Sequence, residues 1–86
     1  MSDTRPMQRD EFSAAAQRAA GVVAARRRGD DAGAATLMAE FPDAEVKALG
    51  FYVVAELALT LLCKETGDSM DTTVQRLNLA IAAGLS

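Results

Sequence analysis

Residues 48–63 decide the fold, and they read Ala48-Leu-Gly-Phe-Tyr-Val-Val-Ala-Glu-Leu-Ala-Leu-Thr-Leu-Leu-Cys63. Between Lys47 and Lys64, the only side chain that is charged at neutral pH is Glu56. A helix over this stretch is apolar around most of its circumference, so other helices must cover it, either from this chain or from a second copy. We therefore expect it to be the central helix of an all-α protein.

Outward from this stretch, helix signals divide the chain into four predicted helices, at about 10–28, 31–41, 43–66 and 69–83. A flexible arm is expected over residues 1–7. Pro42 disfavours helical geometry at the residue before it, and Gly29 and Gly67 suit the left-handed caps that end helices. Since the connections are only a few residues long, the sequence predicts a single α-helical domain over 8–86, a small four-helix bundle of two hairpins completed by dimerisation.

Polar residues at the predicted helix starts supply the caps: Asp30 or Asp31, then Asp43, then Asp68 or Ser69. Apolar residues at helical spacing define the faces that should point inward. These are Phe12, Ala15, Ala16, Ala19, Val22 and Val23 in the first helix, Leu37, Met38 and Phe41 in the second, and Met70, Val74, Leu77 and Ile81 in the fourth. Leu79 falls on the opposite side of the fourth helix.

The composition favours self-association over catalysis. Half of the 86 residues are hydrophobic, which is more than so small a domain can hide by itself. The chain has no histidine, which removes the commonest general base and metal ligand, and Cys63 is its only cysteine. We therefore expect no enzymatic activity, no catalytic residues, no cofactor and no metal site.

The location expected from the sequence is the cytoplasm. The first twelve residues are polar, unlike a signal peptide. The apolar run is shorter than the about 20 residues of a bilayer span and contains Glu56, so we do not expect a membrane protein. The net charge of −3 argues mildly against non-specific binding to nucleic acid or to an anionic membrane.

The candidate interface residues lie in the two C-terminal helices: Phe51, Tyr52, Val54, Glu56, Leu57, Leu61 and Leu79. Within this set, Tyr52 precedes Glu56 by one helical turn. A small-ligand or enzymatic role, the third alternative, would need a pocket beside this pair and a raised pKa of the Glu56 carboxyl. The simpler interpretation places Glu56 in a polar stripe that faces water or a dimer seam.

Residues Glu65 to Ile81 suggest an alternative in a different class. Their Thr66-Gly67-Asp68-Ser69 turn and the apolar spacing of Val74 and Leu77 resemble the junction between the two helices of ribbon-helix-helix repressors. That resemblance implies an obligate dimer that reads DNA with a two-stranded ribbon. Here residues 46–52 would form the ribbon, and Lys47 is their only basic residue.

The candidate nucleic-acid contacts are Arg26, Arg27, Arg28 and Lys47. Three consecutive arginines could contact phosphates, although they also suit the carbonyl end of a helix. The function that the sequence favours is a non-enzymatic homodimeric adaptor or regulatory module with a further protein partner. The alternative is a DNA-binding regulator whose C-terminal half is ribbon-helix-helix-like or helix-turn-helix-like.

Overall fold

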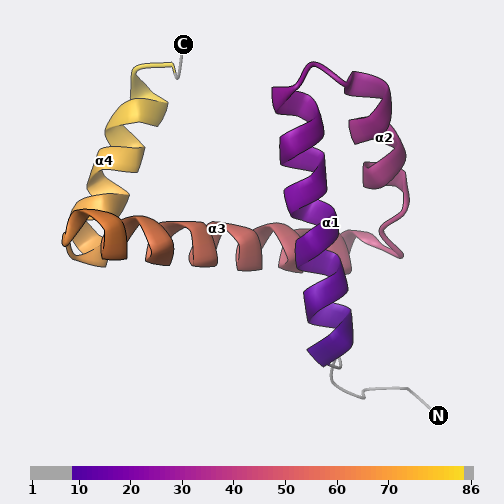
Figure 1. Cartoon of the computed structure of the whole chain (residues 1–86), viewed down its shortest axis with the longest axis horizontal. Helices are drawn as coiled ribbons and strands as arrows, with labels where there is room; N and C mark the ends of the chain where they lie inside the picture. Colours follow the sequence, from indigo (N-terminus) through magenta and orange to yellow (C-terminus); the bar gives the residue numbers. More distant parts are fainter. Residues whose placement is uncertain (1–8, 85–86) are drawn as a thin grey trace. The chain divides into compact units, whose positions relative to one another are not determined.

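The computed structural model describes residues 9–84, which form four α-helices and no strand (Figure 1). The helices are α1 (Arg9–Arg27), α2 (Asp31–Ala39), α3 (Ala44–Thr66) and α4 (Met70–Ala82). The all-α fold class is therefore confirmed, and each helix begins and ends within two residues of its predicted range. The predicted arm over residues 1–7 lies outside the described residues.

The caps explain these boundaries. Asp30 Oδ1 accepts a hydrogen bond from Gly33 N at 2.9 Å, Asp43 Oδ1 from Val46 N at 2.8 Å, and Ser69 Oγ from Thr72 N at 3.1 Å. Each bond satisfies one of the amides that the first turn of a helix leaves without a partner. The structure thus selects Asp30 and Ser69 where the sequence left two choices.

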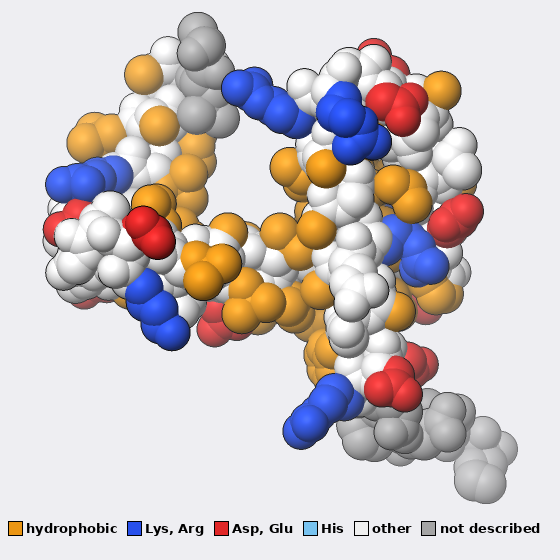
Figure 2. All heavy atoms as spheres, viewed as in Figure 1, with side chains coloured by type: hydrophobic (Ala, Val, Ile, Leu, Met, Phe, Trp, Pro, Cys, Tyr) orange, Lys and Arg blue, Asp and Glu red, His pale blue; other side chains and the backbone are white. Residues whose placement is uncertain are grey.

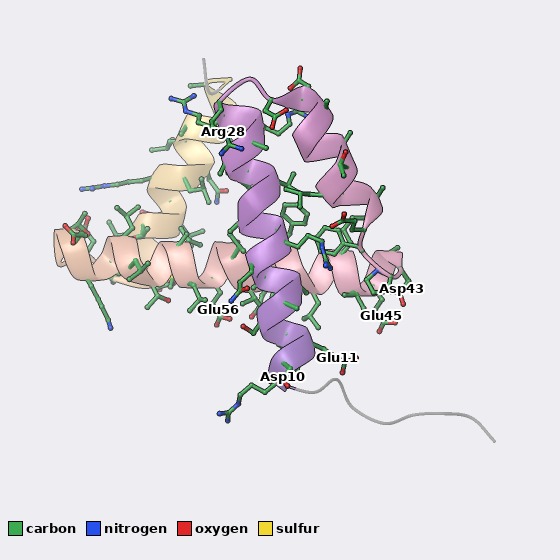
Figure 3. All side chains as sticks on the ribbon, turned by 45° about the vertical axis from the view of Figure 1, so that its right-hand side comes forward. Asp10, Glu11, Arg28, Asp43, Glu45 and Glu56 are labelled. Atoms are coloured by element: carbon green, nitrogen blue, oxygen red, sulfur yellow. The ribbon has the colours of Figure 1, made fainter. Side chains whose placement is uncertain are left out.

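Charges at the helix ends follow the helix dipole. Figure 3 shows Asp10 and Glu11 in the first turn of α1, Arg28 beyond its far end, and Glu45 in the first turn of α3. Carboxylates near an amino end and cations near a carboxyl end are each stabilising. Gly29 and Gly67 follow α1 and α3 with φ of 82° and 79°, the left-handed geometry that glycine adopts without strain.

The contacts divide the chain into two units, Met1–Val54 and Ala55–Ser86, with the boundary inside α3. In the first unit, α1 and α2 run side by side as an antiparallel hairpin (Figure 1). Its core is made of small residues and one aromatic ring: Ala15, Ala19, Val22, Ala25, Ala34 and Phe41. The single domain over 8–86 stays a prediction.

Glycine brings α3 close to α1 within this first unit. A Cβ atom built on Gly50 would lie only 2.6 Å from the carbonyl oxygen of Ala15, so no larger residue fits without a shift of the backbone. Nearby, the rings of Phe41 and Phe51 pack with centroids 5.9 Å apart. The first turns of α3 therefore complete the core of the hairpin.

The helix α3 is not wrapped by the described chain. Gly50 is its only buried residue, although the apolar stretch from 48 to 63 led us to expect a central helix. By length and composition alone α3 could cross a membrane, and only 6% of the relevant window is buried. Some of the predicted inward residues of α1 and α2 also remain open to solvent, among them Phe12, Val23 and Met38.

Candidate functional site

The exposed apolar side chains of the second unit form the candidate interface. Seven large ones lie between Ala55 and Ala82, with exposed fractions from 39% to 71%. They are Leu57, Leu61 and Leu62 of α3 and Met70, Leu77, Leu79 and Ile81 of α4. Figure 2 draws the hydrophobic side chains, including those along α3 and α4, as orange spheres. Concentrated exposed apolar surface is a feature that protein–protein and membrane interaction sites share.

The junction between α3 and α4 shows which side of α3 is covered. Cys63 Sγ lies 3.2 Å from Thr73 Oγ1, and that hydroxyl donates a hydrogen bond to the Ser69 carbonyl oxygen at 2.9 Å. Thr73 is the buried residue of α4, and Cys63 and Leu59 are half-buried. The side of α3 that carries Cys63 therefore meets α4.

The leucines of α3 lie away from that contact. With 3.6 residues per turn, Leu57, Ala58 and Leu61 fall on the side of the helix opposite Cys63, and Leu62 falls beside them. All four residues are exposed. We call Leu57, Ala58, Leu61 and Leu62 the leucine face.

The structure separates the predicted interface residues into two groups. Phe51 and Val54 pack against the core of the first unit, so the hairpin already uses part of their surface. The other predicted residues, Tyr52, Glu56, Leu57, Leu61 and Leu79, are exposed. Tyr52 and Glu56 present an exposed phenol and an exposed carboxylate rather than the enclosed pair that acid–base chemistry would need.

Four exposed apolar residues of this surface were missing from the predicted interface: Leu62, Met70, Leu77 and Ile81. The sequence contained a signal for Leu62, since the apolar residues of 48–63 extend around most of the helix. Met70, Leu77 and Ile81 were expected on an inward seam. The spacing identified that seam correctly as one stripe, but periodicity does not show whether the same chain covers it.

An open hollow of about 310 Å³ lies along α4, lined by Gln75, Asn78 and Leu79. Two carboxamides and a leucine provide hydrogen-bonding groups beside an apolar contact, but no nucleophile, acid or base. Within residues 9–84, no group of three or more cysteine, aspartate and glutamate side chains is placed to hold a metal ion.

The candidate nucleic-acid residues are partly engaged with acids. Arg26 Nε lies 4.0 Å from Asp31 Oδ1, and Arg28 Nη2 lies 3.8 Å from Asp30 Oδ2. Arg27 is exposed. Carboxylates this close weaken the positive potential that phosphates would meet.

Lys47 lies apart from these arginines within the first unit. The arginines are at the end of α1, whereas half-buried Lys47 is in the first turn of α3, and α2 runs between the two places (Figure 1). A fourth arginine, Arg18, is held inside the hairpin. Its Nε lies 3.7 Å from Glu40 Oε1, and its guanidinium carbon lies 5.5 Å from the centroid of the Phe41 ring.

Comparison with protein-family models, with curated proteins and with solved structures finds no match to this chain. The function must therefore be argued from the residues and their surroundings.

Proposed function

We propose that this chain is a non-enzymatic interaction module that pairs with a second copy of itself and presents the assembled helical surface to a further protein. The observation that carries the proposal is the exposed apolar surface of the second unit, where seven large apolar side chains are open and Thr73 is the buried residue of α4. Water makes such a surface costly, and association is the ordinary way to remove it.

The exposed area is close to what a stable pair needs. At about 1.45 Å² of surface per dalton of extended chain, the exposed fractions of the seven side chains amount to on the order of 600 Å². A standard interface buries about 800 Å² on each partner. Completing the burial of each half-exposed leucine would contribute about 1 kcal/mol. Ordinary neighbouring contacts could supply the remaining area.

We extend the proposal to the arrangement of the helices. Two helical hairpins, one from α1 and α2 and one from α3 and α4, would form a bundle when the second copy supplies the cover that α3 lacks. The chain would act in the cytoplasm, since a bilayer would have to accommodate Glu56 within the apolar stretch of α3.

The experiment is the molecular mass in solution, measured by light scattering behind a sizing column over a dilution series of the full chain. We expect twice the chain mass, 18 kDa from the 9.0 kDa of one chain, and no change on moderate dilution. A monomer at every concentration would overturn the proposal. A mass that falls gradually to 9.0 kDa would give the dissociation constant of the pair.

DNA binding is the second candidate, and one observation favours it. The helix α4 follows α3 after the three-residue connection Gly67-Asp68-Ser69 and leaves its end at a steep angle (Figure 1). This is the layout of a helix-turn-helix, and exposed Gln75, Arg76 and Asn78 are residue types that read base edges.

Charge argues against this second candidate. Arg76 Nη1 is paired with Asp68 Oδ2 at 3.0 Å, and the net charge of the chain is −3. A DNA-binding protein would show affinity for duplex DNA that falls steeply as salt rises. We expect no retardation of a duplex probe at 50 mM salt, and retardation that disappears at 200 mM would favour this candidate over the first.

A further inference from the structure

The leucine face of α3 has two properties that bear on what covers it. Leu57 and Leu61 are 57% and 63% exposed, and they lie one helical turn apart on the side opposite the contact with α4. From Leu57 to Leu62 the chain carries no charged side chain. The face is therefore a narrow, uncharged stripe that is suited to another helix.

We propose that the leucine face binds the same face of a second copy, with the two α3 helices antiparallel. This inference rests on the proposed function and adds its geometry. When two identical helices run in opposite directions, Leu57 of each copy can lie opposite Leu61 of the other, so the stripe is complementary to itself. The two-fold axis then passes near Ala58 and Leu59.

A second copy suits this face better than a bilayer does. The exposed parts of its three leucines amount to on the order of 300 Å², about half of the apolar area available on the second unit, so one pairing removes the largest single share. A bilayer would have to enclose Glu56 directly before the face as well as Lys64 and Glu65 directly after it, whereas a second helix leaves such flanking charges in water.

The first unit favours antiparallel over parallel pairing. The helix α1 crosses α3 at Gly50, close to the amino end of α3, where the backbones of Gly50 and Ala15 meet. In a parallel pair, both copies would bring their α1 and α2 helices to the same end of the interface. In an antiparallel pair these hairpins lie at opposite ends, and the two α3 dipoles oppose each other favourably.

The first test places one charge on the proposed face and a matched charge elsewhere. Leu61→Glu introduces a carboxylate into the leucine face, and Ala82→Glu introduces one at an exposed residue of α4 outside the seven apolar side chains. We expect Leu61→Glu to raise the dissociation constant at least 100-fold, while Ala82→Glu changes it less than threefold. Far-ultraviolet circular dichroism would verify that both variants keep their helices.

The outcomes of this test are separable from those of the proposed function. A wild-type chain that stays monomeric at every concentration would overturn both, and monomer that co-floats with lipid vesicles would identify a bilayer as the occupant instead. A wild-type dimer that survives Leu61→Glu would overturn the inference alone. Loss of the dimer only in Ala82→Glu would also overturn it, by moving the interface to α4.

The second test addresses direction in a Cys63→Ser background, which leaves the chain without other cysteines. Ala58→Cys lies beside the proposed axis, whereas the two copies of Glu65→Cys would be separated by about 20 Å along the helices. Oxidised glutathione should therefore convert Ala58→Cys to a covalent dimer and leave Glu65→Cys largely uncrosslinked. Equal crosslinking at the two positions would overturn the antiparallel arrangement.

Discussion

The two units of the chain differ in how far they bury their apolar residues. The hairpin of α1 and α2 buries six residues in a shared core, and most of them have the small side chains of alanine or valine. The second half of α3 and α4 carry larger leucines and an isoleucine, yet the buried residue there is a threonine. The more hydrophobic region is thus the less buried one.

This contrast shows that hydrophobicity and burial are separate properties. Small residues such as Ala15 and Ala19 allow helices to approach closely, so a core forms with little apolar volume. Leucines on several sides of one helix cannot all be covered by a single neighbouring helix. The first unit therefore buries a core of its own, while our proposal has the second unit complete its packing against a second copy.

The largest effect is expected at Ala19, which is 0% exposed in the core of α1. Ala19→Asp would place a carboxylate among apolar groups without a partner, so we expect the free energy of unfolding to fall by about 4 kcal/mol. Ala20→Asp, at the exposed neighbouring position, should cost less than about 1 kcal/mol. Urea titration followed by circular dichroism measures both. Similar losses for the two variants would mean that the hairpin has no fixed core.

The next largest loss of stability is expected for an aromatic residue of the first unit, and a leucine of the second unit serves as its comparison. Phe41→Ala removes the contacts of its ring with Phe51 and with the Arg18 guanidinium, and should cost about 3 kcal/mol. Leu79→Ala removes a largely exposed side chain and should cost less than about 0.5 kcal/mol. Thermal unfolding at one fixed chain concentration would compare the two. A larger loss for Leu79→Ala would show that α4 is buried in the assembled protein.

A smaller effect is expected where α1 and α3 meet. Gly50→Ala adds a Cβ atom against the backbone of Ala15, so α1 must shift, and we expect a net loss of about 2 kcal/mol. Gly21→Ala is the control, because there the added Cβ meets only the terminal Cδ1 of Leu37, at 3.2 Å. A helix interior favours alanine over glycine by about 1 kcal/mol, so this control should be neutral or stabilising. If Gly50→Ala were also stabilising, α3 would not be held against α1.

The boundaries of the helices were predictable because their causes are local. Pro42, the caps at Asp30 and Ser69, and the left-handed glycines Gly29 and Gly67 each act within a few residues of chain. The inward face of α1 was predictable in part, since its spacing identified Ala15, Ala19 and Val22. Phe12 and Val23 lie on the edges of that face and remain exposed.

The burial of α3 was not predictable, because it depends on which distant parts of the chain pack against the helix. The spacing of Phe51, Val54, Leu57 and Leu61 is continuous along one helix, but the first two residues pack on the core of the hairpin and the last two are open. No local feature of the sequence distinguishes the two packed residues from the two exposed ones. The candidate interface stays a prediction, including the roles of Tyr52, Glu56 and Leu79.

The smallest loss of stability is expected on removing one of two equivalent helix caps, one in each unit. Asp30→Ala and Ser69→Ala each remove a side chain that accepts a hydrogen bond from a first-turn amide, and each should cost about 1 kcal/mol. We expect hydrogen exchange to quicken mainly in α2 for the first variant and in α4 for the second, because the two helices belong to different compact units. Dilution of Ser69→Ala should accelerate exchange in the second half of α3, which the second copy is proposed to cover, and should leave α2 unchanged. Exchange that quickens equally in all four helices of either variant would show that the units unfold together, and the division drawn here would then be wrong.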